Sequence, residues 1–267
     1  MGRSGAGKTT ALKTLIFNDL RAGRGFAVLD PLGHLAEAVI DAVPKERNHE
    51  TVYFNPSDLA RPIGFNPLAD VPADGRHLVA DHVVSAIAHI WGMSLADAPR
   101  MTYILYNSLR LLLDTPGSTL LGLARLLIDD RYRTRLLKAC RDPVVSAFWV
   151  NEFAAYDDRF RAQAIAPVQN KIGMLLAGPI ANIIGQRRST IDIARLMNEG
   201  GCLVANLAKG KIGATGSHLL GALLATTIAQ VADSDNRTAN AGTAISGIDQ
   251  CSIGASSTRP RCRARTC

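Results

Sequence analysis

Four residues near the beginning of the chain have the types and the spacing of a phosphate-binding loop. Gly2, Gly7, Lys8 and Thr9 match the pattern G-x-x-x-x-G-K-[ST] within MGRSGAGKTT. In such a loop, backbone N–H groups surround phosphate oxygens, the lysine reaches the β- and γ-phosphates, and the hydroxyl helps to hold Mg²⁺. These residues predict a nucleoside triphosphate site, and a glycine-rich turn that caps a helix is the alternative.

A loop of this kind connects a buried strand to the beginning of a helix. The helix is indicated, because apolar residues recur at helical spacing after Lys8 and Gly23 can end it. The apolar positions are Leu12, Leu15, Ile16 and Leu20. Only Met1 precedes Gly2, so we expect the strand before the loop to have been lost or left out of the reading frame.

Strands and helices alternate in the segments that follow and precede a long central stretch. Residues 26–30 (FAVLD), 51–56 (TVYFNP) and 202–207 (CLVANL) have the composition of buried strands. Helices are predicted within 31–44 and 217–231. This βα alternation predicts an α/β fold with a parallel sheet.

Between about 76 and 185 the strand signals vanish and helical periodicity takes over. Asp142-Pro143 predicts a helix N-terminus, and Ser189 or Thr190 is expected to begin the helix before 202. We therefore predict a discontinuous nucleotide-binding domain (1–75 and 186–235), an all-helical insertion (76–185) and a poorly ordered basic tail (236–267).

Composition limits the classes of protein that this chain can represent. Of its 267 residues, 47% are hydrophobic, which allows a sizeable core. Five cysteines with no C-x-x-C pair favour neither a disulfide framework nor a zinc site. The net charge is +7, but the tail supplies five arginines against one aspartate, so bulk charge supports DNA binding only weakly. The uncharged stretch 212–232 is interpreted as a buried helix rather than a membrane span.

Several segments together resemble a known family. The loop, VLDPLGHLAEAVIDAVP, GFNPL, DPVVSAFWVNEF and VANLAKGKIGATGSHLLGALL are similar to segments of the conjugative coupling ATPases of type IV secretion, within the HerA-FtsK group of P-loop motors. The likeness spans about residues 1–233, so the chain looks truncated at both ends. The resemblance implies a RecA-like P-loop NTPase fold with an incomplete sheet.

The same resemblance implies ATP and Mg²⁺ as cofactors, DNA as cargo or track, a homo-hexamer when complete, and secretion-channel proteins as partners. It also implies a cytoplasmic location peripheral to the inner membrane, with no membrane span in this chain. The nucleotide loop would comprise seven residues: Gly2, Gly5, Ala6, Gly7, Lys8, Thr9 and Thr10.

Acidic residues for Mg²⁺ and water activation are less clear in the sequence. Asp30 matches the acid of the family's D-P-x-G segment, although Leu32 and His34 depart from the family pattern. Asp30 is expected either to support Mg²⁺ or to cap the following helix. The family's Asp-Glu strand has only Asp249-Gln250 as a counterpart, in a segment unfavourable for a buried strand, and glutamine cannot act as a base.

Other basic residues have both a functional and a structural interpretation. Lys209 and Lys211 would contact DNA or a neighbouring subunit's nucleotide, or lie in a solvated turn. Arg187 and Arg188 are candidates for trans-acting arginines. A row of three basic residues within 131–141 would follow phosphates or form a solvated face beside two aspartates.

The sequence thus predicts the ATP-binding motor domain of a DNA-translocating ATPase, in an incomplete copy. A nucleotide-binding remnant that does not hydrolyse ATP is the alternative. A small-molecule kinase is disfavoured by the large helical insertion.

Overall fold

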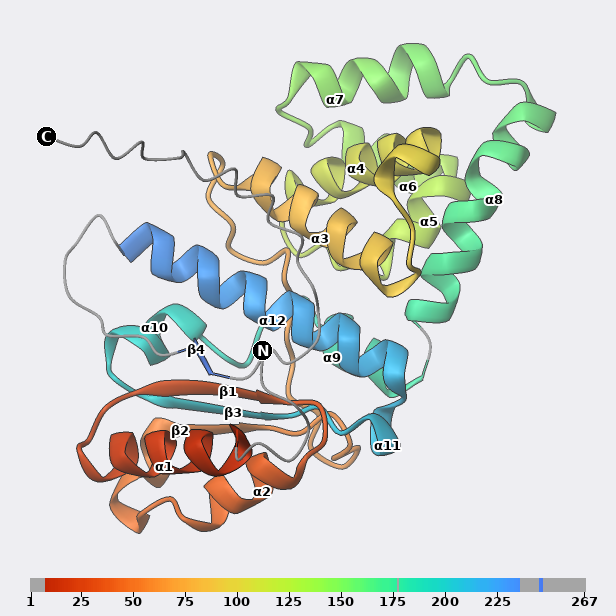
Figure 1. Cartoon of the computed structure of the whole chain (residues 1–267). Helices are drawn as coiled ribbons and strands as arrows, with labels where there is room; N and C mark the ends of the chain where they lie inside the picture. The colour runs from red at the N-terminus through yellow and green to blue at the C-terminus, as the bar shows by residue number, and fades with distance from the viewer. Residues whose placement is uncertain (1–7, 177, 236–244, 247–267) are drawn as a thin grey trace, which may run out of the picture.

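A computed structural model describes residues 8–176, 178–235 and 245–246, and it is mostly helical around a small parallel sheet (Figure 1). The strands are β1 (Phe26–Asp30), β2 (Thr51–Phe54), β3 (Cys202–Asn206) and the two-residue β4 (Ile245–Ser246). Their order is β2-β3-β1-β4, and all three pairs are parallel. The α/β class and three of these strands were predicted from the sequence, and both predictions are confirmed.

Helices cover both faces of the sheet. The helices on one face are α1 (Lys8–Arg21) and α2 (His34–Asp41); those on the other include α10 (Ile193–Asn198) and α12 (Ala214–Asp235) (Figure 1). Successive strand residues point to opposite faces. Phe26 and Val28 of β1 therefore pack with α1 and α2, whereas Ala27 and Leu29 join the core on the α12 side. Burial on both faces explains why the strands are continuous apolar runs.

Between β2 and β3 the described residues form helices and loops, with no strand. The helices there are α3 (Arg76–Ile90), η2 (Leu95–Asp97), α4 (Pro99–Leu113), α5 (Gly122–Ile128), α6 (Asp130–Leu137), α7 (Pro143–Ala147), the π-helical turn η3 (Phe148–Phe153), α8 (Asp158–Leu175), α9 (Pro179–Ile184) and α10. The short helix η1 (Lys45–Glu50) comes just before β2. After β3 come the short α11 (Lys209–Ile212) and α12. The helices α3 to α9 thus span almost the same residues as the expected insertion.

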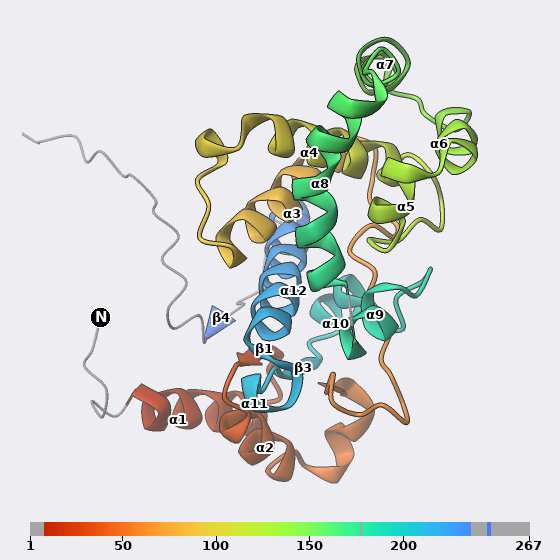
Figure 2. The ribbon, with the colours of Figure 1, turned by 90° about the vertical axis from the view of Figure 1, so that its right-hand side faces the viewer.

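The sheet and these helices share one hydrophobic core. Leu29 of β1, Val83 of α3 and Leu220 of α12 belong to the same buried cluster. Helix α12 packs along α3 and also contacts α10 (Figure 2). The division of the chain into separate domains remains a prediction, because the core is continuous between the two parts.

Two helix boundaries differ from those predicted. Helix α10 has Asp192 as its N-cap, whose carboxylate accepts a hydrogen bond from the Arg195 N–H at 2.9 Å. Ser189 and Thr190, the predicted caps, accept instead from the backbone N–H groups of Asn66 and Gly64, at 3.0 and 2.9 Å. Helix α12 begins at Ala214 rather than Ser217. The two hydroxyls therefore do not cap α10, because they bond to a segment more than a hundred residues away in the sequence.

Among the described residues, no helix combines the length and the apolar character needed to cross a bilayer. The predicted basic tail lies outside the described residues except for Ile245 and Ser246, which form β4 against β1. The sequence had indicated that this segment was unfavourable for a strand.

Candidate functional site

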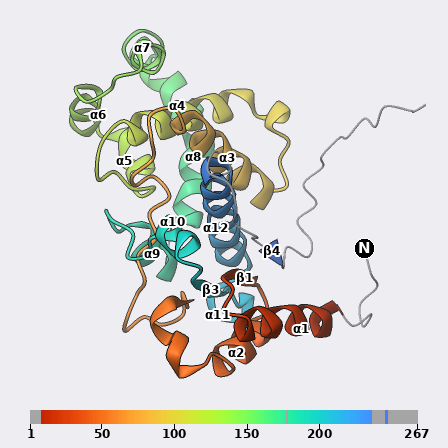
Figure 3. The same ribbon diagram turned by 90° about the vertical axis from the view of Figure 1, so that its left-hand side faces the viewer.

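The carboxyl ends of the parallel strands β1 and β3 lie at one edge of the sheet. Asp30 ends β1 and Asn206 ends β3, and the two are paired in the strand register. Residues 22–25 connect α1 to β1. The beginning of α1 is the end of the helix that lies farther from β1 and β3 (Figures 2 and 3), and Thr9 and Thr10 in this first turn are exposed. In open parallel sheets, ligands bind in the crevice at this edge.

The Asp30 carboxylate is buried and caps α2. Its Oδ2 accepts hydrogen bonds from the backbone N–H groups of Leu35 and Ala36, at 2.8 and 3.0 Å. Its Oδ1 accepts from the Leu32 N–H at 2.9 Å, and the residue is only 6% exposed. Of the two interpretations of Asp30, the cap is therefore confirmed. A role in holding Mg²⁺ remains a prediction, since a carboxylate has about four acceptor positions and three are occupied here.

Replacing Asp30 with alanine is expected to lower the free energy of unfolding by about 2 kcal/mol, because it removes a cap and leaves buried N–H groups of α2 without an acceptor. Urea denaturation followed by circular dichroism measures the change. Asp41→Ala is the matched control, because Asp41 is exposed at the other end of α2. Equal stability of the two variants would contradict the capping role.

Asn206 was not singled out from the sequence, yet it joins three elements at this edge. Its Nδ2 donates to the Tyr53 hydroxyl at 2.9 Å, and its Oδ1 accepts from the Ala208 N–H at 3.3 Å. Gly33, at φ +89°, stands so close that a Cβ atom there would lie 2.8 Å from Asn206 Oδ1. The sequence did contain a signal for Asn206, because a polar residue at the end of the buried run CLVAN needs hydrogen-bond partners.

The loop after β3 brings basic residues to the same edge. The backbone N–H of Lys209 donates to the Pro31 carbonyl at 3.1 Å, which ties α11 to the loop after β1. The Lys211 ammonium lies 3.3 Å from the Glu37 carboxylate, and both side chains are half exposed. Burial and the nearby positive charges of Lys209 and His89 lower the pKa of His218 at the start of α12. For Lys211, these contacts favour the solvated position over a contact with DNA or nucleotide, because its side chain is half exposed and pairs with Glu37 of α2.

The other candidates are dispersed. Arg187 and Arg188 are exposed, and Arg187 lies beside Gly117, after α4. Arg131 and Arg135 of the basic row belong to α6 and Lys138 is its C-cap, and Figure 2 shows α6 far from α1. Neither group contributes to the edge that holds Asp30 and Asn206.

Four residues of the predicted nucleotide loop lie outside the described residues, namely Gly2, Gly5, Ala6 and Gly7. Asp249 of the predicted acidic pair also lies outside them. Lys8, Thr9 and Thr10 form the first turn of α1, and both threonines are exposed. Within the described part of the chain, no group of three or more His, Cys, Asp and Glu residues is arranged to hold a metal ion.

Comparisons with known proteins identify no family for this chain. No protein-family model matches it, and no curated protein matches it significantly.

Proposed function

We propose that the chain is the ATP-binding motor domain of a DNA-translocating ATPase of the coupling type. The observation that carries the proposal is the Gly-Lys-Thr-Thr sequence at the N-terminus of α1, where Lys8, Thr9 and Thr10 form the first turn of the helix. The first N–H groups of a helix have no partner within the helix, and its dipole favours an anion there. A triphosphate is the anion that the Gly-Lys-Thr sequence suits best.

The chain's own residues have separable tasks in this proposal. The loop amides and the first turn of α1 bind the phosphates, and Lys8 places a positive charge on the β- and γ-phosphates. Thr9 supplies a hydroxyl to Mg²⁺, which when bound neutralises the developing charge on the phosphates. Asp30 fixes the N-terminus of α2 through the N–H groups of Leu35 and Ala36, and it also accepts from the Leu32 N–H just before the helix. It thereby holds the floor of the site rigid.

The partners in this proposal rest on the resemblance of the sequence and not on the described contacts. They are DNA, further copies of the chain in a hexamer, and secretion-channel proteins at the inner membrane. The RecA-like form of the sheet belongs to the same proposal. The order β2-β3-β1-β4 is compatible with it, because β4 adds a parallel strand next to β1.

A site that binds ATP without hydrolysing it is the second candidate. The sequence observation that favours it is Gln250, which follows Asp249 where a glutamate would activate water. Both candidates require nucleotide binding, and they differ only in turnover. Phosphate release in the presence of saturating Mg·ATP, with and without DNA, therefore separates them.

Titration calorimetry of the full chain with Mg·ATP tests the binding that both candidates share. We expect saturable one-site binding that Lys8→Ala abolishes, because the variant loses the charge on the β- and γ-phosphates. Lys13→Ala is the matched control, since Lys13 lies in the same helix more than one turn later. Binding that survives Lys8→Ala unchanged, or its absence in a chain that is folded by circular dichroism, would overturn the proposal.

A further inference from the structure

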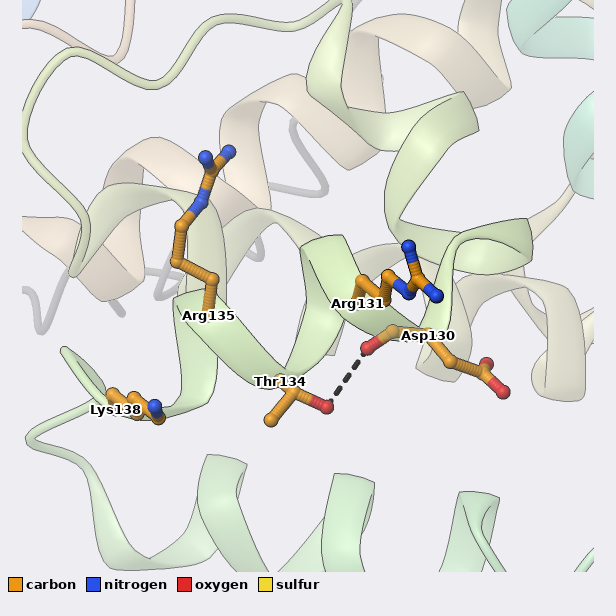
Figure 4. Close-up of a pocket in the computed structure, with 5 residues that line it drawn as sticks. All are labelled: Asp130, Arg131, Thr134, Arg135 and Lys138. Carbon is orange, nitrogen blue, oxygen red and sulfur yellow. Dashed lines mark hydrogen bonds between the residues drawn. The ribbon is translucent and has the colours of Figure 1, made fainter.

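Helix α6 carries a row of basic residues on one exposed face. Arg131, Arg135 and Lys138 follow one another at spacings of four and three residues, which places them on the same side of a helix. Together with Asp130 and Thr134 they line a shallow, open pocket. Figure 4 shows Arg131 and Arg135 extending on the same side of α6, with the Thr134 hydroxyl donating to the Asp130 carbonyl at 2.8 Å.

The two aspartates at the start of α6 do not neutralise this row. The Asp129 carboxylate accepts from the Tyr132 N–H at 2.9 Å and pairs with Arg125 at 2.9 Å. These two interactions lower the pKa of Asp129. Asp130 pairs with Arg133. Both carboxylates are therefore engaged by other groups, and within the described residues no ion pair involves the three cations of the row.

One arginine of the row is ordered by an aromatic ring. The Arg135 guanidinium lies 5.2 Å from the centre of the Tyr132 ring, and Arg125 lies 4.7 Å from the same ring. Tyr132 is itself half-buried. A guanidinium held against a ring loses less conformational freedom when it binds a ligand, so part of the entropic cost of binding is already met.

We propose that this row, Arg131, Arg135 and Lys138, is a binding site for successive phosphates of a nucleic-acid backbone. The choice of DNA as that nucleic acid rests on the proposed function. Along a helix, residues 131 to 138 span about 10 Å, at 1.5 Å per residue. One DNA strand places a phosphate every 3.4 Å of its axis, so three successive phosphates span about 7 Å and four span about 10 Å of axis. The row thus matches a short linear array of negative charges.

A phospholipid surface is the competing anionic partner, and the described surface favours it less. Helices that bind membranes carry a large apolar face beside the basic one. On α6 the exposed residues are polar or charged, and Leu136 is buried in the core. Phosphate contacts without inserted apolar groups are typical of sequence-independent DNA binding.

The test is fluorescence anisotropy of a labelled DNA duplex with the full chain, without nucleotide, between about 50 and 200 mM salt. The variant Arg131→Gln/Arg135→Gln/Lys138→Gln removes the row. Its matched control, Arg21→Gln/Lys45→Gln/Arg61→Gln, removes three exposed positive charges, one in α1, one in η1 and one after β2. Calorimetry with Mg·ATP on the row variant shows whether the nucleotide site is intact.

We expect the row variant to bind DNA about ten-fold more weakly or worse, with a salt slope reduced by up to about 2.7, because each lost phosphate contact removes about 0.9. The control variant should stay within about two-fold of the unmodified chain. Equal losses in both variants would show that only bulk charge acts, and would overturn the proposal. Binding of the row to anionic vesicles but not to DNA would overturn it in favour of a membrane. Loss of ATP binding in Lys8→Ala with DNA binding retained would leave the row independent of the nucleotide site.

Discussion

Replacing Trp149 with alanine is expected to lower the free energy of unfolding by about 3–5 kcal/mol. The indole is 1% exposed in η3 and lies 5.0 Å from the Phe148 ring and 4.7 Å from the Phe153 ring, centre to centre. Its Nε1 donates to the Asn107 carbonyl at 3.3 Å, and the Arg133 guanidinium lies 5.9 Å from the ring. The substitution leaves a cavity among aromatic rings that are themselves buried.

Urea denaturation followed by circular dichroism measures this loss. Tryptophan fluorescence is unsuitable, because the variant retains only one of the chain's two tryptophans. Val150→Ala is the control at the next position, where the side chain is 55% exposed, and it should change stability by less than about 0.5 kcal/mol. A loss below about 1 kcal/mol for Trp149→Ala would mean that the cluster is not packed as described.

Replacing Asp114 with alanine is expected to lower the free energy of unfolding by about 3 kcal/mol at neutral pH. Its carboxylate is 5% exposed, pairs with Arg76 at 2.8 Å, and accepts from the backbone N–H groups of Arg141 and Asp142 at 2.9 and 3.3 Å. The substitution leaves a largely buried guanidinium and two N–H groups without their partner. Because Arg141 and Asp142 follow α6, the same change should loosen the end of the helix that carries the basic row.

The effect of Asp114 should depend on pH. Burial by itself would raise the pKa of Asp114, but the hydrogen bonds from Arg141, Asp142 and Arg76 outweigh burial and lower it. A carboxyl group whose pKa is lowered by folding stabilises the protein fully above its unfolded pKa of about 3.9, and this contribution is lost as the pH falls through the folded value.

Urea denaturation of Asp114→Ala and the unmodified chain at a series of pH values measures both predictions. The difference in stability should be constant near neutral pH and shrink below about pH 4. Asp97→Ala is the control, since Asp97 is exposed in η2. A difference that stays constant down to the lowest pH at which the chain folds would contradict the role of the ionised carboxylate.

Local sequence patterns determined much of the fold. The apolar run FAVLD predicted β1 with its observed ends, and Gly23, at φ +70°, follows α1 as predicted. Asp142-Pro143 predicted α7, where the Asp142 carboxylate accepts from the Val144 N–H at 2.8 Å. These signals are local, because strand burial, helix caps and left-handed glycines depend on a few neighbouring residues.

Tertiary contacts decided what local patterns left open. The sequence allowed Asp30 either a cap or a metal role, and the packing of α2 against the end of β1 brought the N–H groups of Leu35 and Ala36 to its carboxylate. It offered Ser189 and Thr190 as caps, but the segment around Gly64 took their hydroxyls. Asn206 gained its role only when β2 and β3 became neighbours, since that placed the Tyr53 hydroxyl within reach.

The sequence by itself determined the chemistry available to this protein: the Gly-Lys-Thr turn, the strand-ending Asp30 and the spacing of the basic residues on α6. Only the tertiary structure decided which of these groups remain uncompensated. The aspartates beside the basic row pair with Arg125 and Arg133, four and three residues away along the chain, and not with the row itself. Spacing offers each carboxylate several local partners, and the direction in which each side chain leaves its helix decides which one it takes.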